Sequence, residues 1–273
     1  MTETAPNSLP SLTFSESDRL AFISDLHLSP SRPDITERLD QYLREQATHA
    51  TCLFILGDLF EYWVGDDANI ACGYVDIEKL LADYVAIDGH RLLVMHGNRD
   101  FLIGNQFCQR TGGELIPDPV MIQIGSHPLL LAHGDAYCTD DVDHQEFRKL
   151  TRQQSWQDEF LSRTVEERIG FANQARSRSE AGKSSKSMAI MDVREQSVVN
   201  AMEDAKVNTL IHGHTHRPAV HQHQRQDAHF RRVVLGDWYD QNSSLEITGG
   251  AIHYATGGRH YHLPLGEPII STR

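Results

Sequence analysis

The sequence has few cysteines and no long hydrophobic run. Its 273 residues include only four cysteines, Cys52, Cys72, Cys108 and Cys138, and no two of them form a C-x-x-C pair. This spacing is unlike a disulfide framework or a cysteine zinc site, so we expect four reduced thiols. No apolar stretch approaches the roughly 20 residues that a spanning helix needs, so any membrane association is expected to be peripheral.

The chain as a whole also has few positive charges relative to its negative charges. There are 25 Lys and Arg residues against 38 Asp and Glu residues, which gives a formal net charge of −13. Sequence-independent nucleic-acid binding relies on clustered cations that neutralise phosphates, so we expect no nucleic-acid partner. The 40% of hydrophobic residues is typical of a globular protein with a sizeable core.

The N-terminal segment differs in character from the rest. Residues 1–18 are polar, contain two prolines and lack the cationic and apolar regions of a signal peptide. We therefore expect a disordered leader over 1–18 and one domain over 19–273. Nothing in the sequence identifies a protein partner.

Six short apolar runs each end in a polar cluster. The runs are 20–23, 52–56, 92–95, 129–132, 209–211 and 233–235. Segments of helical length, such as 35–45 and 76–85, separate the first three, and this alternation predicts an α/β sheet. Ligands of such sheets bind outside the carboxyl ends of the strands, so we expect the polar clusters to converge on one edge.

The first five of those clusters contain a set of possible metal ligands. They are Asp25, His27, Asp58, Asn98, His133, His214 and His216. A lone D-x-H or G-D is usually a turn or a helix cap, but five such clusters in order favour one site. Seven nitrogen and oxygen ligands are too many for one ion. They suit two divalent ions about 3.5–4 Å apart, as in two-metal phosphoester hydrolysis.

The remaining histidines have weaker claims to this site. His212 shares the alternation of His214 and His216, and we expect it to lie behind the ligands. Four others have no carboxylate at ligand spacing and are expected at the solvated surface: His221, His223, His260 and His262.

The spacing of the clusters indicates an insertion. His133 and His214 are 81 residues apart, whereas the other neighbouring clusters are 33 to 40 residues apart. The inserted part has helical periodicity up to residue 169 and again over 188–207, with a loop expected over 176–187. Residues 146–187 include nine basic and six acidic side chains. We therefore expect a cationic helical cap, inserted at about 142–205.

These blocks resemble the D-x-H, G-D, G-N-H-[DE], H and G-H-x-H blocks of the calcineurin-like metallophosphoesterases, over about residues 20–235. Within that superfamily the chain is similar to the UDP-2,3-diacylglucosamine hydrolases of lipid A biosynthesis. The strings that carry this resemblance are SDLHL at 24–28, ILGDLFEYWVGDD at 55–67, HGNRDFLIG at 96–104, HGDAYCTDD at 133–141, SSKSMAIMDV at 184–193 and LIHGHTHRPAV at 210–220.

The resemblance implies a fold, a reaction and a location. The fold is a four-layer metallophosphoesterase α/β sandwich with an inserted helical cap. The reaction is hydrolysis of the pyrophosphate of UDP-2,3-diacylglucosamine to UMP and 2,3-diacylglucosamine 1-phosphate, with a hydroxide activated by two Mn²⁺ ions attacking the uridylyl phosphorus. The location is the cytoplasm, with peripheral association at the cytoplasmic face of the inner membrane.

The resemblance also implies roles for individual residues. One ion takes Asp25, His27, Asp58 and His216, and the other takes Asp58, Asn98, His133 and His214. Asp58 then bridges the ions and is catalytic. The substrate is expected against Asn98, Arg99, Asp141, Ser179, Lys183, Lys186 and His214. The family often has Asn where this chain has Lys183.

The third block departs from the broader superfamily. G-N-H-[DE] has become Gly97-Asn98-Arg99-Asp100, so the histidine that can protonate a leaving alkoxide is absent. A pyrophosphate leaves as a phosphate with a pKa of about 6, which needs no proton, and arginine can clamp phosphate oxygens bidentately. Arg99 therefore favours a phosphoanhydride substrate, and we expect it to be catalytic.

Two alternatives to this function remain open. One is another dimetal nucleotide pyrophosphatase or phosphodiesterase, and the other is a non-enzymatic, metal-stabilised interaction module. Within the cap, five large apolar residues either line an acyl-chain groove or form the core of the cap: Phe147, Trp156, Phe160, Leu161 and Phe171.

Overall fold

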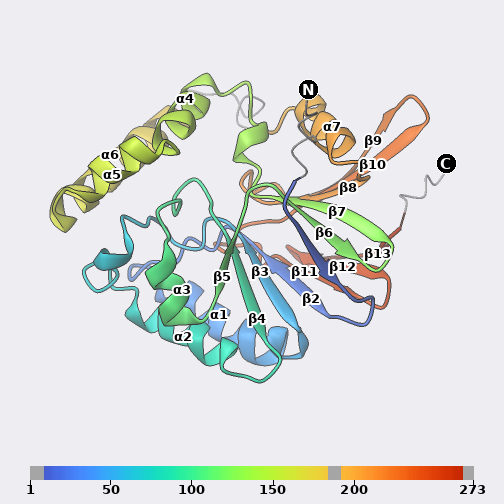
Figure 1. Ribbon diagram of the computed structural model, residues 1–273, viewed down its shortest axis with the longest axis horizontal. Helices are drawn as coiled ribbons and strands as arrows, with labels where there is room; N and C mark the ends of the chain where they lie inside the picture. The colour runs from blue at the N-terminus through green and yellow to red at the C-terminus, as the bar shows by residue number, and fades with distance from the viewer. Residues whose placement is uncertain (1–8, 184–191, 267–273) are drawn as a thin grey trace, which may run out of the picture.

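The centre of the structure consists of two β-sheets that face each other, with helices on their outer faces (Figure 1). The computed structural model describes residues 9–183 and 192–266, and for 178–183 it describes the backbone only. The first sheet has the order β1 (Ser11–Phe14), β6 (Val120–Ile124), β7 (His127–Ala132), β8 (Thr209–His212), β10 (Ala228–Val234) and β9 (Ala219–Arg225). The second has the order β13 (Arg259–Pro264), β12 (Ala251–Thr256), β11 (Ser244–Thr248), β2 (Leu20–Ile23), β3 (Cys52–Leu56), β4 (Arg91–Met95) and β5 (Glu114–Ile116).

The helices fall into three groups. The second sheet is covered by α1 (Pro33–Glu45), α2 (Val75–Val85) and α3 (Asn105–Thr111), and the first by α7 (Glu195–Asp204). The helices α4 (Val142–Thr151), α5 (Gln154–Leu161) and α6 (Val165–Lys183) extend to the upper left in Figure 1. Three short 3₁₀ turns complete the list: η1 (Ala47–His49), η2 (Asp66–Ala68) and η3 (Asp135–Tyr137).

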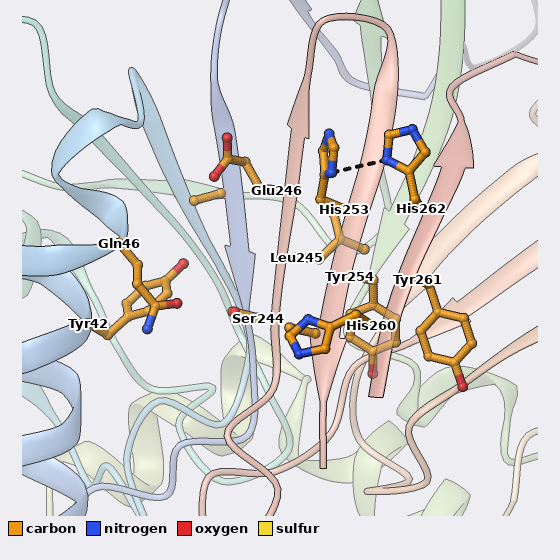
Figure 2. Close-up of a pocket in the computed structure, with 12 residues that line it drawn as sticks. Tyr42, Gln46, Ser244, Leu245, Glu246, His253, Tyr254, His260, Tyr261 and His262 are labelled. Atoms are coloured by element: carbon orange, nitrogen blue, oxygen red, sulfur yellow. Dashed lines mark hydrogen bonds between the residues drawn. The ribbon is translucent and has the colours of Figure 1, made fainter. Parts of the chain in front are cut away.

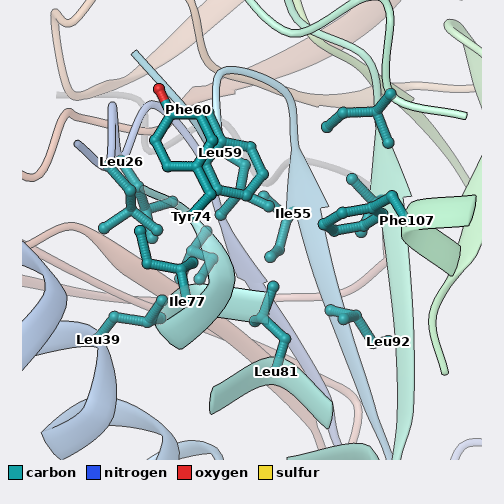
Figure 3. Close-up of a cluster of buried hydrophobic side chains, with 14 of the residues drawn as sticks. Leu26, Leu39, Ile55, Leu59, Phe60, Tyr74, Ile77, Leu81, Leu92 and Phe107 are labelled. Atoms are coloured by element: carbon teal, nitrogen blue, oxygen red, sulfur yellow. The ribbon is translucent and has the colours of Figure 1, made fainter. Parts of the chain in front are cut away.

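Three hydrophobic clusters join these elements into four layers. Alternate residues of a strand point to opposite faces, so Leu20 and Phe22 of β2 face the other sheet, while Ala21 and Ile23 face the helices. Figure 3 shows part of the cluster between the second sheet and its helices. The third cluster lies between the first sheet and α7. The expected four-layer α/β sandwich is therefore confirmed.

Two segments differ from the sequence-based expectations. Within the leader expected over 1–18, Ser11–Phe14 form β1, because Phe14 is buried between the sheets and the strand pairs in parallel with β6. The loop expected from residue 176 is also partly wrong, since α6 continues to Lys183.

The region expected to form the cap, 142–205, contains two kinds of helix. The helix α7 belongs to the outer layer of the first sheet, where Val198, Val199 and Met202 are buried. Residues in α5 and α6 instead pack against the hydrophobic cluster that lies between the second sheet and its helices. We therefore use the word cap below for α4 to α6 alone. The four cysteines are free thiols, as expected.

Candidate metal centre

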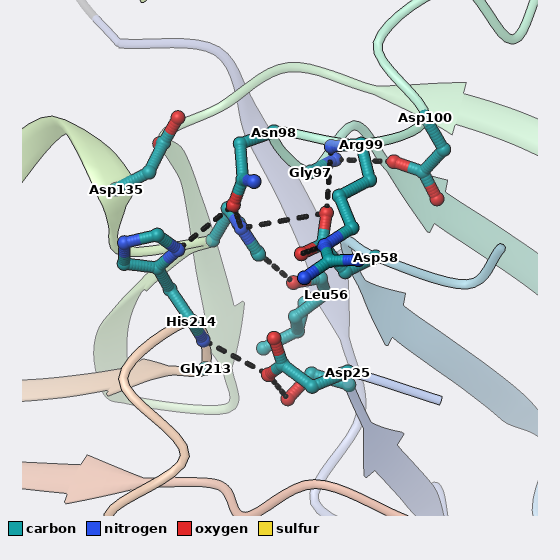
Figure 4. Close-up of polar contacts among 12 residues, drawn as sticks. Asp25, Leu56, Asp58, Gly97, Asn98, Arg99, Asp100, Asp135, Gly213 and His214 are labelled. Carbon is teal, nitrogen blue, oxygen red and sulfur yellow. Dashed lines mark hydrogen bonds and ion pairs between the residues drawn. The ribbon is translucent and has the colours of Figure 1, made fainter. Parts of the chain in front are cut away.

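The seven expected ligands converge at the carboxyl ends of strands from both sheets. Figure 4 shows four of them: Asp25, Asp58, Asn98 and His214. The seven follow five strands: Asp25 and His27 after β2, Asp58 after β3, Asn98 after β4, His133 after β7, and His214 and His216 after β8. The sequence predicts that the polar clusters converge on one edge of a single sheet. They instead come from two sheets, because β7 and β8 belong to the first sheet and the other three strands to the second. The site lies where the two sheets meet.

The backbone at this site has an unusual conformation. Five of the seven residues, all except Asn98 and His133, have φ between 51° and 67°. Non-glycine residues rarely adopt this left-handed region, and each such residue costs of the order of 1–3 kcal/mol unless its surroundings hold it in place. The hydrogen bond from the Asp25 amide to the Gly57 carbonyl and that from the His27 amide to the Asp58 carbonyl hold the first of these turns against the second.

The Asp58 carboxylate lies between histidines from opposite sheets. Its Oδ1 is 3.8 Å from Nε2 of His133, and its Oδ2 is 3.9 Å from Nε2 of His27. The Arg99 backbone N–H donates a hydrogen bond of 2.9 Å to Oδ1. One oxygen therefore faces each half of the site, which is the geometry a bridging carboxylate requires.

A hydrogen bond in one case and a neighbouring carboxylate in the other orient two of the imidazoles with one nitrogen toward the site. The Nδ1–H of His133 donates to the Leu56 carbonyl at 2.9 Å, which leaves Nε2 facing Oδ1 of Asn98 at 3.1 Å. His216 places Nδ1 3.4 Å from the Asp237 carboxylate and Nε2 3.3 Å from Asp25. Carboxylate and carbonyl partners of this kind fix the tautomer of metal-ligating histidines.

The donor set fits divalent metal ions. Ligand atoms of Asp25, His27 and His216 lie within 4.8 Å of one another, as do those of Asp25, Asp58 and His133. The Nε2 atoms of His27 and His216 are 3.1 Å apart, and Oδ1 of Asp25 is buried, makes no hydrogen bond and lies 3.3 Å from Nε2 of His216. Buried polar atoms left unpaired are costly, so a cation between these groups explains their arrangement.

Burial and neighbouring charges shift the protonation of these groups. Burial raises the pKa of Asp58 to about 7. Burial alone would lower the pKa of His133, but the carboxylates of Asp58 and Asp135 raise it to about 9. Burial also lowers the pKa of His27 and of His214 well below the usual range. Neutral His27 and His214 can bind a cation directly, whereas Asp58 and His133 must first release their protons before they can bind one.

Two glycines allow the ligand loops to approach one another. A Cβ at Gly97 would collide with the side chain and amide of Asp58. A Cβ at Gly213 would collide with Asp25 and Ser24. These positions need glycine because another backbone passes close by, which is a tertiary reason rather than a turn preference.

The side chain of Arg99 lies beside Asp58 and is only 20% exposed. Its Nε is 3.9 Å from Oδ2 of Asp58, and its guanidinium forms an ion pair with Glu61. Burial alone would lower the pKa of Arg99, but Asp58 and Glu61 raise it, so the side chain stays charged. Asp100 accepts hydrogen bonds of 2.7 Å from the amides of Leu59 and Gly97, which ties the loop carrying Arg99 to the loop carrying Asp58.

The expected substrate contacts are only partly described. Asn98 lies in the site, with its Oδ1 2.9 Å from Nδ1 of His214. Asp141 caps α4 by accepting a hydrogen bond of 3.1 Å from the His144 amide. The side chains of Ser179 and Lys183, and all of Lys186, lie outside the described residues.

Sequence reasoning missed several side chains that hold the ligands. Asp237 follows the last apolar run within a G-D pair, so the signal that identified Asp58 was present there too. Glu61 lies in the string at 55–67, and Tyr239 stacks on the His27 ring with centroids 5.4 Å apart and planes 7° apart. No local pattern marks these two, because their partners come from distant segments.

Other histidines have different surroundings from the ligands. His212 is buried, donates from Nδ1 to the Gly213 carbonyl at 2.9 Å and has its Nε2 3.4 Å from Arg232. The expectation of a solvated His223 is wrong, since its side chain is 8% exposed and 3.0 Å from Glu195 of α7. His260 and His262 are exposed as expected, beside a cavity of about 320 Å³ on the outer face of β11 to β13 (Figure 2).

Aromatic residues of the cap pack against one another and join the hydrophobic cluster of the body. Trp156 stacks on Phe160 with ring centroids 4.8 Å apart, and Phe171 lies 5.3 Å from Phe160. Phe147 and Leu161 are instead 37% and 40% exposed. Trp156, Phe160 and Phe171 therefore pack as core residues rather than lining an open acyl-chain groove.

Several cap arginines bind groups of the body. Arg148 is 2.9 Å from Asp135 and 3.3 Å from Asp118, and Arg168 is 2.5 Å from Asp67. Part of the expected positive charge of the cap is therefore neutralised within the molecule.

Comparisons with known proteins agree with this geometry. A family model described as calcineurin-like phosphoesterase matches residues 18–218, a span that contains all seven expected ligands. A UDP-2,3-diacylglucosamine hydrolase of Stenotrophomonas maltophilia (strain K279a) is 44% identical over 238 residues, or 84% of this chain and 94% of that protein. A protein of the same name from Cellvibrio japonicus (strain Ueda107) is 44% identical over 227 residues, or 83% of this chain and 94% of that protein.

Proposed function

The chain belongs to the calcineurin-like phosphoesterase family, and on that premise we propose that it hydrolyses the pyrophosphate bond of UDP-2,3-diacylglucosamine. The products are UMP and 2,3-diacylglucosamine 1-phosphate, an intermediate of lipid A biosynthesis. The observation that carries this proposal is the convergence of seven ligand-type residues beside Arg99, in a chain that matches a hydrolase of that name over 94% of its length. The enzyme is a metal-dependent phosphoanhydride hydrolase.

We assign the ligands to two divalent ions, with Mn²⁺ as the proposed metal. One ion is held by Asp25, His27, Asp58 and His216, and the other by Asp58, Asn98, His133 and His214. When bound, such ions lower the pKa of water and offset negative charge on phosphoryl oxygens. The imidazole-rich set favours Mn²⁺ over Ca²⁺, which prefers six to eight oxygen ligands. Metal analysis and reactivation after chelation test this choice.

Arg99 has a role that the ions do not replace. Water attacks the uridylyl phosphorus, and the bond to the bridging oxygen breaks, so the sugar 1-phosphate departs. That phosphate needs no proton, which is consistent with an arginine in place of histidine. The Arg99 guanidinium lies beside Asp58, and we propose that it contacts the phosphate oxygens. There it stabilises the negative charge that develops during attack. Asn98 and His214 are proposed to face the same phosphates.

We propose that the cap binds the sugar and its acyl chains. The sugar end is assigned to Asp141, Ser179, Lys183 and Lys186 by resemblance. For the acyl chains, α4 offers the exposed apolar residues Val142, Phe147 and Leu150, which are 61%, 37% and 48% exposed. Exposed large apolar side chains that gather on one helix are typical of a surface for an apolar ligand.

The membrane is the proposed source of the substrate. Among the described residues, no helix is long and apolar enough to cross a bilayer. We propose peripheral association with the cytoplasmic face of the inner membrane, because a lipid with two acyl chains resides there. The exposed apolar residues of α4 support this proposal more directly than the basic residues of the cap, of which Arg148 and Arg168 are paired with acidic groups of the body.

A product assay tests the proposed function. Purified chain with Mn²⁺ should release UMP from UDP-2,3-diacylglucosamine, as resolved by mass spectrometry. UDP-glucosamine should be cleaved at least about 100-fold less efficiently in kcat/KM, since each buried CH₂ contributes about 0.8 kcal/mol. Equal efficiency on both substrates would replace the lipid assignment with a generic nucleotide pyrophosphatase. If the chain hydrolysed no phosphoanhydride at all, the non-enzymatic, metal-stabilised interaction module would be the remaining interpretation.

A further inference from the structure

Glu61 is a buried carboxylate in the loop after β3, and the roles assigned above do not use it. Its side chain is 5% exposed. The Glu61 amide donates a hydrogen bond of 3.0 Å to the Leu28 carbonyl, and the neighbouring Phe60 forms a β-bridge with Leu28. The backbone of Glu61 is therefore held next to the turn that carries His27.

Two arginines from different parts of the chain meet at one oxygen of Glu61. Arg99 forms an ion pair with Oε1, and Nε of Arg176, from α6 of the cap, lies 3.1 Å from the same atom. Arg99 also lies 3.9 Å from Asp58, so the two guanidinium groups lie close to two carboxylates. Two guanidinium groups so close together would repel each other strongly without the carboxylate.

The other oxygen of Glu61 faces the metal side of the site. The Tyr239 hydroxyl donates a hydrogen bond of 2.8 Å to Oε2, and the Tyr239 ring stacks on His27. Nδ1 of His27 is buried without a hydrogen-bond partner and is 3.9 Å from Oε2. A small approach would let Nδ1–H donate to Glu61 and point Nε2 at the metal, which is the usual carboxylate support of a ligating histidine.

We propose that Glu61 is a positioning residue for the phosphoryl transfer described above. It fixes the Arg99 guanidinium beside Asp58, links the cap to that guanidinium through Arg176, and orients His27 from behind. The inference rests on the proposed function for its kinetic consequences, whereas its consequences for metal binding and cap docking do not depend on the substrate. Glu61 itself does not touch the reacting atoms.

The kinetic test uses Glu61→Gln, which keeps the shape of the side chain and removes its charge. The variant should lower kcat about 100-fold with a smaller change in KM, because the transition-state contact of Arg99 is misplaced. With Mn²⁺ at saturating concentration, so that weaker metal binding through His27 has no effect, the double variant E61Q/R99A should be no slower than R99A alone. Glu61→Asp, which restores the charge, should recover part of the activity. Independent, multiplying losses in the double variant would overturn the proposal.

A matched control separates positioning from general stability. Glu246 of β11 also pairs with an arginine, since its Oε1 is 2.7 Å from Nε of Arg19, but it lies outside the site. Glu246→Gln should leave kcat and KM unchanged. Tyr239→Phe removes the hydroxyl bound to Glu61 and leaves both ion pairs, so it should lower kcat several-fold. The same substitution should not lower kcat further when Glu61 is already Gln, so E61Q/Y239F should match E61Q.

Two measurements without substrate complete the test. Metal titration should show about 10-fold weaker binding of one ion in Glu61→Gln, and limited trypsin digestion should cut the cap faster than in Glu246→Gln. Wild-type metal affinity, cap protection and kcat in a folded Glu61→Gln would overturn the proposal. If the wild-type chain releases no UMP while these two changes occur, the proposed function fails and the positioning role of Glu61 stands.

Discussion

The Asp58 carboxylate and the His133 imidazole face each other across the two sheets, with 3.8 Å between Oδ1 and Nε2 and both side chains buried. Burial raises the pKa of Asp58 to about 7, and the carboxylates around His133 raise its pKa to about 9. In the metal-free protein at neutral pH, the imidazole is protonated and the carboxyl is partly protonated. A cation must displace those protons before it can bind both groups.

Metal affinity should therefore rise with pH. The ligands bind protons in the metal-free form and none in the loaded form, so protons are released on binding and the affinity increases between about pH 6 and pH 9. Calorimetric titration of Mn²⁺ in two buffers of different ionisation enthalpy measures the number of protons released. A pH-independent affinity without proton release would contradict the assignment of these two residues as ligands.

Replacement of Asp58, the proposed bridging carboxylate, should nearly abolish turnover. Asp58→Asn removes the negative charge whose two oxygens face His27 and His133, so kcat should fall at least about 1,000-fold. The far-ultraviolet circular dichroism spectrum should barely change, because Asn fits the same space. Substantial activity in a folded Asp58→Asn variant would rule out Asp58 as the bridge.

Lysine should not substitute for Arg99. The arginine reaches both Asp58 and Glu61 with a planar fork of donors, and an ammonium group offers a point charge instead. We expect Arg99→Lys and Arg99→Ala to lose similar transition-state stabilisation, about 2–4 kcal/mol from kcat/KM. Steady-state kinetics on the diacylated substrate provide the measurement. Normal kinetics in Arg99→Ala would mean that the charge beside Asp58 is not used in catalysis.

The space at Gly97 should matter more than its flexibility. A methyl group there would collide with Asp58, so Gly97→Ala should reduce activity and metal affinity together by displacing the bridge. The control is Gly170→Ala, since a Cβ at Gly170 in α6 meets no atom within 4 Å and alanine favours a helix interior by about 1 kcal/mol. That control should keep full activity and unfold at an equal or higher temperature. Metal retention in an inactive Gly97→Ala would show that the loop of Arg99, rather than Asp58, had moved.

Local sequence was sufficient to identify the candidate ligands and to predict that they lie together. Each candidate ligand lies within four residues of the end of a strand, so strand, turn and side chain are neighbours in the chain. The periodicity of the runs indicated buried strands, and polar residues at their ends indicated an edge where ligands bind. The replacement of histidine by Arg99 was also readable, because it lies inside one of these blocks.

Only the tertiary structure decided how these residues are oriented and supported. The tautomer of His133 depends on the Leu56 carbonyl, and the setting of Arg99 depends on Glu61, with 77 and 38 positions between the partners. The strand β1 exists because Phe14 finds a place between the two sheets, although its surrounding sequence is polar. Interactions between distant segments leave no local periodicity, because chain closure and packing select them only once the sheets have formed. The sequence therefore determined which chemical groups meet at the site, and the packing of two sheets and a cap determined the directions in which they point.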